Sequence, residues 1–192
     1  MNSVILASAS RQRKKLLALT GLKFRVQVSH APELTKITTT CQDLVMKNAF
    51  AKAEDVAATV KRGLVIAADS VVYLGKKRII GKPRHLKDAK RILKILFSQP
   101  HWVYTGLAVI DAATGKRVVD YEKTKIYMTR LSDAEIDRYH AKMHPMDKAG
   151  GFDIEGRGGV FIRRIEGCYT NVIGLPMAKL RIILKKFGME VL

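Results

Sequence analysis

Cysteine is scarce in this sequence, and Cys41 and Cys168 are the only two among 192 residues. They are not spaced as C-x-x-C, and no histidine cluster accompanies them. The sequence therefore indicates neither a disulfide framework nor a zinc knuckle. We expect both side chains to be buried free thiols, because unpaired cysteine behaves as a small apolar residue.

Long apolar runs and linkers are also missing. No stretch approaches the roughly 18 apolar residues that span a bilayer, and a strand expected from residue 4 leaves no room for a signal peptide. We therefore expect a cytoplasmic protein with no membrane partner. The 192 residues, 47% of them hydrophobic, suffice for one substantial core and not for two typical domains, so residues 1–192 are interpreted as a single domain.

Acidic residues are few, with 17 Asp and Glu against 35 Lys and Arg, and the net charge is +18. The partner should therefore be an anion. Net charge does not distinguish a nucleic acid, an acidic membrane surface and a small polyphosphate. Most of the basic residues fall on the polar sides of expected helices, which is typical of ordinary solvated faces.

The hydrophobic pattern alternates between strand and helix. Strands are expected over residues 4–7, 24–28, 64–73, 78–80, 101–111, 116–129, 160–166 and 169–173, and helices over 11–20, 42–60, 86–97, 133–140 and 176–187. This order indicates an α/β fold whose sheet has an antiparallel portion.

The segment Ser8-Ala9-Ser10-Arg11-Gln12-Arg13 joins the first expected strand to the first expected helix. Unpaired N–H groups and the positive end of the helix dipole favour a phosphate there, and arginine supplies two-pronged donors. The alternative is that Ser10 is a helix N-cap followed by solvated basic residues.

Two carboxylates are candidates for a site. Asp69 follows the buried-type run at 64–68, and ligands meet open α/β sheets at the carboxyl ends of strands. The alternative for Asp69 is an aspartate that bonds a nearby turn. Glu33 follows the strand-like segment at 24–28, and its alternative is a plain surface acid.

Two lysines are candidates for phosphate binding. Lys52 shares one helix face with Val45 and Val56, so it must extend to solvent or meet an anion. Lys82 precedes Pro83, which favours extended backbone and an outward side chain. The alternative for Lys82 is an ordinary turn lysine.

Six segments in order resemble the Maf family of nucleoside triphosphate pyrophosphatases, over nearly the whole chain. They are Ser8–Arg13, Ala68–Val72, Gly81–Pro83, Tyr104–Gly106, Lys148–Gly156 and Asn171–Pro176. The resemblance implies a Maf- or ITPase-like α/β fold, in which a mixed twisted sheet with flanking helices forms two lobes around a nucleotide-binding groove. It also implies cleavage of a nucleoside triphosphate to monophosphate and pyrophosphate with a divalent metal. Members of the family are often dimers, so a homodimer is one expectation.

The resemblance also implies roles for single residues. Asp69 would be the catalytic base and, with Glu33, would hold the metal. The positions that would bind substrate are Ser8, Ser10, Arg13, Lys52, Ser70, Lys82 and Glu155. Charge supports this arrangement, because a carboxylate close to a triphosphate is repelled by about 4 kcal/mol per pair unless a cation lies between them. Oxygen ligands of this kind favour Mg²⁺ or Mn²⁺.

The preferred base is read from departures from the family pattern. Arg11 and Gln12 replace the Pro-Arg pair of the dTTP and UTP subgroup, and Glu155 replaces its Gln. A carboxylate at 155 resembles the subgroup that acts on 7-methyl-GTP, whose base is cationic. The segment at 69–72 is closer to the pyrimidine subgroup, so dTTP and UTP are expected and 7-methyl-GTP is the alternative.

Other interpretations remain open or are disfavoured. His140 and His144 have the spacing of a metal pair, but no Glu follows His140 and Pro145 follows His144, so no zinc site is expected. Trp102 and Tyr104 fit a packed strand face. The glycines at 150–159 could simply permit a bend.

A basic nucleic-acid-binding module would explain the charge but leave the two carboxylates without a task, so no nucleic-acid partner is expected. A role in regulating cell division is also associated with the family, and no residues in the sequence test that role.

Overall fold

The computed structural model describes residues 3–147 and 149–191 and is built on a mixed sheet with the strand order β2-β1-β3-β5-β6-β7. The strands are β1 (Val4–Leu6), β2 (Phe24–Val26), β3 (Leu64–Gly75), β4 (Arg78–Ile80), β5 (His101–Asp111), β6 (Arg117–Met128) and β7 (Ile162–Glu166). β1 runs parallel to β2 and β3, whereas the pairs β3–β5, β5–β6 and β6–β7 are antiparallel. The expected mixed α/β sheet is confirmed.

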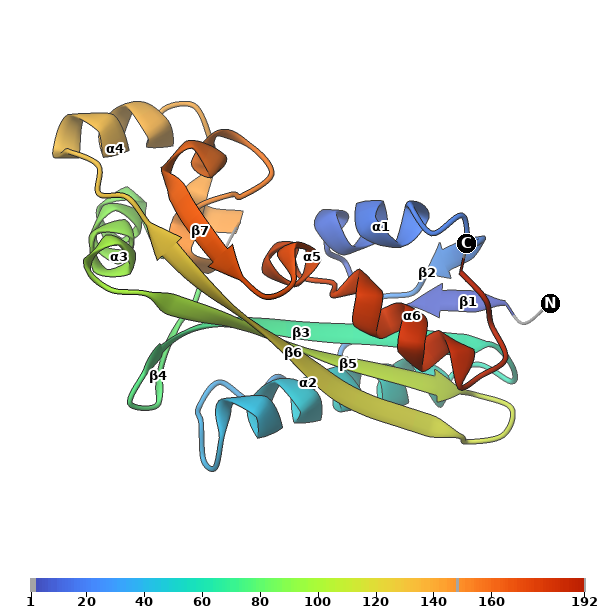
Figure 1. Ribbon diagram of the computed structural model, residues 1–192. Helices are drawn as coiled ribbons and strands as arrows, with labels where there is room; N and C mark the ends of the chain where they lie inside the picture. The colour runs from blue at the N-terminus through green and yellow to red at the C-terminus, as the bar shows by residue number, and fades with distance from the viewer. Residues whose placement is uncertain (1–2, 148, 192) are drawn as a thin grey trace.

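Helices cover both faces of the sheet. They are α1 (Arg11–Ala18), α2 (Cys41–Ala57), α3 (Leu86–Ser98), α4 (Asp133–His140), α5 (Tyr169–Ile173) and α6 (Met177–Lys185), with short 3-10 helices at Pro145–Asp147, Ala149–Gly151 and Arg157–Phe161. Figure 1 shows α2 beneath the sheet and the other labelled helices on the opposite side. No helix within residues 3–147 and 149–191 combines the length and the apolar character that crossing a membrane requires.

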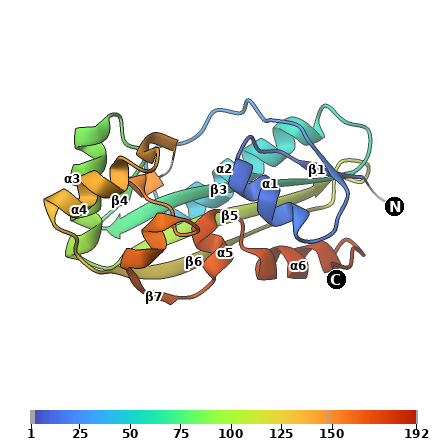
Figure 2. The same ribbon diagram turned by 90° about the horizontal axis from the view of Figure 1, so that it is seen from above.

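The face opposite α2 is divided into two lobes. Figure 2 shows α1 and α6 over one end of the sheet, α3 and α4 over the other, and α5 between them. Each lobe has its own apolar core. Leu17, Leu107 and Leu184 lie in the first core, and Leu93 and Phe161 lie in the second. The sheet continues through both lobes, so the middle of β3 and β5 lies where the lobes meet.

The twelve-residue strand β3 has an interrupted edge. β1 pairs with its residues 64–66 and stops there, while β4 pairs along the same edge only from Val72 onward. Among the described residues, no strand pairs with 67–71 on that side. Asp69 lies in this interval, in the middle of a strand rather than at its carboxyl end as expected. Because β1 ends at Leu6, the edge of β3 beside Asp69 is left open.

Two local expectations were wrong. Residues 169–173 form α5 instead of a strand, although Val172 and Ile173 are β-branched. The buried Asn171 amide donates to the Val103 carbonyl and the Thr124 hydroxyl, and Gly174 ends the helix with φ 118°, so tertiary contacts override β propensity. Cys168, expected to be buried, is only half-buried.

Candidate active site

A cleft of about 840 Å³ lies at the opening along β3, between the two lobes. Eight of the nine predicted site residues line it: Ser10, Arg13, Glu33, Lys52, Asp69, Ser70, Lys82 and Glu155. Ser8 is buried next to Ser10 and contributes through hydrogen bonds. The fold therefore brings the predicted residues of the first lobe together with those of the second, although they are spread over nearly 150 positions of sequence.

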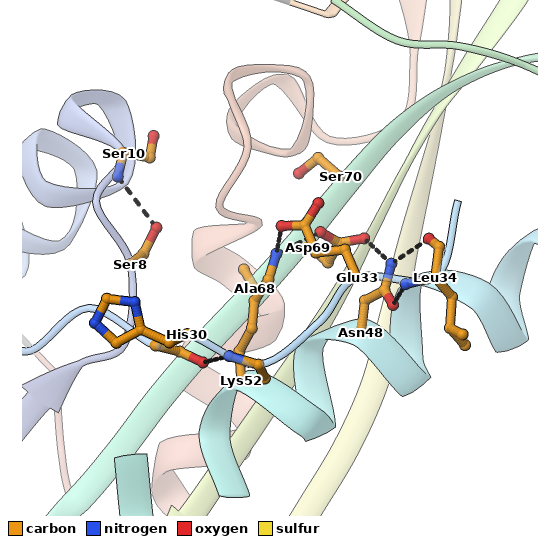
Figure 3. Close-up of polar contacts among 12 residues, drawn as sticks. Ser8, Ser10, His30, Glu33, Leu34, Asn48, Lys52, Ala68, Asp69 and Ser70 are labelled. Atoms are coloured by element: carbon orange, nitrogen blue, oxygen red, sulfur yellow. Dashed lines mark hydrogen bonds and ion pairs between the residues drawn. The ribbon is translucent and has the colours of Figure 1, made fainter. Parts of the chain in front are cut away.

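Lys52 bridges the two predicted metal ligands. Its Nζ lies 2.7 Å from Asp69 Oδ1 and 2.5 Å from Glu33 Oε1 (Figure 3). The side chains of Lys52 and Asp69 are only 13% and 8% exposed, whereas Glu33 is 57% exposed. The lysine on the apolar face of its helix thus meets an anion rather than extending to solvent. Glu33 is therefore the exposed member of a charge array whose other two members, Lys52 and Asp69, are largely buried.

Asn48 is a site residue that the sequence reasoning missed. Its Nδ2 donates to Asp69 Oδ2 at 3.0 Å, and the side chain is buried. Each oxygen of Asp69 therefore has one protein donor, Lys52 on one side and Asn48 on the other. The available signal was a polar residue four positions before Lys52 on the same apolar helix face.

Arg13 uses most of its donors on the protein itself. Its Nε donates to the Gly174 carbonyl at 2.9 Å, and its Nη1 donates to the Ala68 carbonyl at 2.7 Å and to Ser8 Oγ at 3.3 Å. Its Nη2 donates to Ser70 Oγ at 3.0 Å. Because a guanidinium has five N–H groups, one N–H on Nη2 is left for a ligand. Arg13 thus fills the break in the β3 edge by bonding the Ala68 carbonyl there.

The charge of Arg13 is poorly solvated. Burial lowers its pKa, and the carboxylates of Asp69 and Glu33 partly offset this effect. No carboxylate of the described residues lies within ion-pair distance of its guanidinium. A partly buried cation without a contacting anion is well suited to an anionic ligand.

The start of α1 presents a second group of donors. Ser10 caps the helix by accepting from the Arg13 backbone N–H at 3.3 Å, which confirms the N-cap interpretation. Arg11 and Gln12 line the cleft next to it, so the first turn of α1 opens onto the same space. Capping and phosphate binding are compatible here, because the cap uses one of the unpaired N–H groups of the first turn.

The second lobe supplies the opposite wall. Lys82 and Glu155 are exposed at the cleft, and the Gly150 N–H donates to the Gly81 carbonyl, so that the two segments are linked. Lys148, which belongs to the resemblance motif, lies outside the described residues. No group of three or more His, Cys, Asp or Glu in residues 3–147 and 149–191 is placed to hold a metal by itself.

The chain matches a family model and several named relatives over almost its whole length. The family model described as Maf-like protein matches residues 3–187. Proteins named dTTP/UTP pyrophosphatase from Desulforamulus reducens and Pelotomaculum thermopropionicum are 45% and 44% identical, with 100% of each chain covered. One of the same name from Bacillus anthracis is 40% identical over 100% of this chain and 98% of its own.

A solved structure shares the fold at low identity. The Staphylococcus aureus Ham1 protein is 14% identical, with a TM-score of 0.51 over 96% of this chain and 99% of its own, which supports the α/β fold alone. The family match and the full-length relatives carry the assignment. This chain belongs to the Maf family.

Proposed function

We propose that this protein hydrolyses a nucleoside triphosphate, with dTTP and UTP as the expected substrates, to the monophosphate and pyrophosphate. Such an activity would remove unwanted or modified nucleotides. The observation that carries the proposal is the Glu33–Lys52–Asp69 array, which faces the same cleft as the start of α1. The names of relatives at 40–45% identity support the same reaction.

Asp69 is the proposed base. It would orient a water and accept its proton as the water oxygen bonds to the α-phosphorus and the bond from the α-phosphorus to the bridging oxygen breaks. Pyrophosphate leaves with the electrons of that bond. Lys52 and Asn48 hold one oxygen of the carboxylate each, so its orientation is set before substrate arrives.

The cationic groups of both lobes are proposed to bind the triphosphate. The first turn of α1 offers N–H groups, Arg13 offers its charge and one N–H, and Lys82 adds a second charge from the opposite wall. Ser8 and Ser70 act mainly by holding Arg13, since their hydroxyls accept from it. Binding between the lobes would exclude water from the remaining positive surface of the cleft.

We also propose that Glu33 and Asp69 bind Mg²⁺ or Mn²⁺. Two carboxylates are too few for a closed protein site, but they fit an ion of this class that takes its other ligands from phosphate oxygens and water. The contact of one Lys52 ammonium with both carboxylates supports the proposal, because it brings their charges close together. A bound divalent ion would supply charge neutralisation for the triphosphate.

Glu155 favours one alternative substrate. Its carboxylate is exposed at the cleft, and none of the hydrogen bonds and ion pairs among the described residues involves it. A free carboxylate would attract the cationic base of 7-methyl-GTP, whereas dTTP and UTP carry neutral bases. The base preference therefore depends on whether this side chain reaches the base.

A substrate panel tests the proposal. Pyrophosphate release is measured for dTTP, UTP, CTP, 7-methyl-GTP and the other common triphosphates with Mg²⁺, with Mn²⁺ and with EDTA. We expect metal-dependent release, with Asp69→Asn folded and inactive. Release by Asp69→Asn would remove Asp69 from its role. Absence of release from every triphosphate, with steeply salt-dependent binding to long RNA, would instead favour a nucleic-acid-binding module.

A further inference from the structure

Three polar residues of α2 form a row along the segment that carries Glu33. Asn48, Lys52 and Asp55 are spaced by four and three positions, so they share one face of the helix. Asp55 Oδ2 accepts from the Ser29 hydroxyl at 2.7 Å and from the His30 N–H at 2.8 Å. The row therefore holds the segment 29–34, which carries Glu33, at more than one point. Asp55 bonds one end of this segment, and Lys52 contacts Glu33 further along it.

Asn48 holds the other end of this segment by bonding both backbone groups of Leu34. Its Oδ1 accepts from the Leu34 N–H at 2.8 Å, and its Nδ2 donates to the Leu34 carbonyl at 3.0 Å. The same Nδ2 also donates to Asp69 Oδ2 at 3.0 Å, as Figure 3 shows. One buried amide, 3% exposed, thus connects β3 with the residue that follows Glu33.

The connection has a consequence for the two carboxylates. Glu33 lies in a segment without helix or strand, so its distance from Asp69 depends on side-chain contacts. Lys52 bonds both carboxylates, but its four-carbon stem is flexible and allows the distance between them to vary. The amide of Asn48 is planar, short and buried, so it fixes the distance between Asp69 and the backbone next to Glu33 more tightly than Lys52 does.

We propose that Asn48 is a positioning residue, which couples Asp69 to the segment that carries Glu33. The inference rests on the proposed function, because it concerns the geometry of the proposed base and metal ligands. Asn48 acts through the Asp69 carboxylate, to which it donates. Its loss should affect the chemical step more than substrate binding, because the cationic groups that bind the triphosphate are held independently of it.

Asn48→Leu is the main test variant, since leucine fills a similar volume and makes no hydrogen bond. Asn48→Ala is a second variant in case the larger apolar group disturbs packing. We expect kcat to fall about tenfold in both, with KM changed less than about threefold. Asp43→Asn is the matched control. Asp43 accepts from Thr39 and Thr40 at the start of the same helix, away from the cleft, so its variant should lower Tm with kcat unchanged.

A double-mutant cycle with Glu33→Gln separates positioning from general destabilisation. If Asn48 acts through the position of Glu33, the Asn48→Leu loss in kcat should shrink from about tenfold to about twofold in the Glu33→Gln background. Equal losses in both backgrounds, or wild-type kcat in Asn48→Leu and Asn48→Ala, would overturn the inference. These results are read only against active wild-type enzyme, so inactivity of the wild type counts against the proposed function instead.

Discussion

Removing Arg13 should destabilise the fold as well as impair the proposed reaction. Its guanidinium bonds the carbonyls of Ala68 and Gly174, both buried, and the hydroxyls of Ser8 and Ser70. These contacts join α1, β3 and the end of α5 at the break in the β3 edge. In Arg13→Met the apolar stem is kept, but the two carbonyls lose their donor.

The size of the effect follows from these contacts. A buried carbonyl left without a hydrogen-bond partner costs about 1–3 kcal/mol, and two carbonyls lose their donor here. Removing the buried guanidinium charge also removes its desolvation penalty, which offsets part of this loss. We therefore expect Arg13→Met to lower the free energy of unfolding by about 3 kcal/mol. At about 2–4 °C per kcal/mol for a chain of this length, Tm should fall by about 10 °C.

Urea unfolding followed by circular dichroism measures this change, with Arg11→Met as the matched control. Arg11 lies on the same turn of α1 and is exposed, so its removal should change stability by less than about 0.5 kcal/mol. Arg13→Lys should recover little, because one ammonium does not reproduce the planar fork that reaches three elements. Stability of Arg13→Met within 1 kcal/mol of wild type, or full recovery by Arg13→Lys, would refute the reasoning.

Three further predictions concern packing, pH and base preference. A Cβ at Gly106 would lie 2.1 Å from the Val45 carbonyl oxygen, so Gly106→Ala should displace α2 and cost about 3 kcal/mol in urea unfolding, whereas Gly81→Ala, with open space around it, should cost little. Burial lowers the pKa of His101 from 6.5 to about 4. Between these pH values the unfolded chain binds a proton that the folded chain does not, so the free energy of unfolding should decline by up to about 3 kcal/mol as pH falls from 6.5 to 4. A His101→Phe variant whose stability has the same pH dependence would contradict this. Glu155→Gln should lower kcat/KM for 7-methyl-GTP relative to dTTP and UTP in the substrate panel, and an unaltered ratio would separate Glu155 from base recognition.

Much of the fold could be predicted because local patterns and tertiary packing agree over most of the chain. The apolar run at 64–68 forms part of the buried strand β3, and the amphipathic pattern of residues 86–97 matches α3. The expectation failed at 169–173, where β-branched residues favoured a strand. There the buried amide of Asn171 bonds β5 and β6, and no local pattern encodes those partners.

Sequence alone also determined which chemical groups are available for the site. Lys52 on an apolar helix face had either to reach solvent or to meet an anion, and Ser10 before a basic helix start was a candidate N-cap. It could not determine that the anions are Asp69 and Glu33, that Asn48 bonds both Asp69 and the residue after Glu33, or that Arg13 spends four N–H groups on the protein. These facts depend on where β1 ends beside β3, and therefore on the sheet as a whole. Composition and periodicity act over a few residues, whereas hydrogen-bond partners such as Asn48 and Asp69, 21 positions apart, or Arg13 and Ala68, 55 positions apart, are chosen only when the strands assemble.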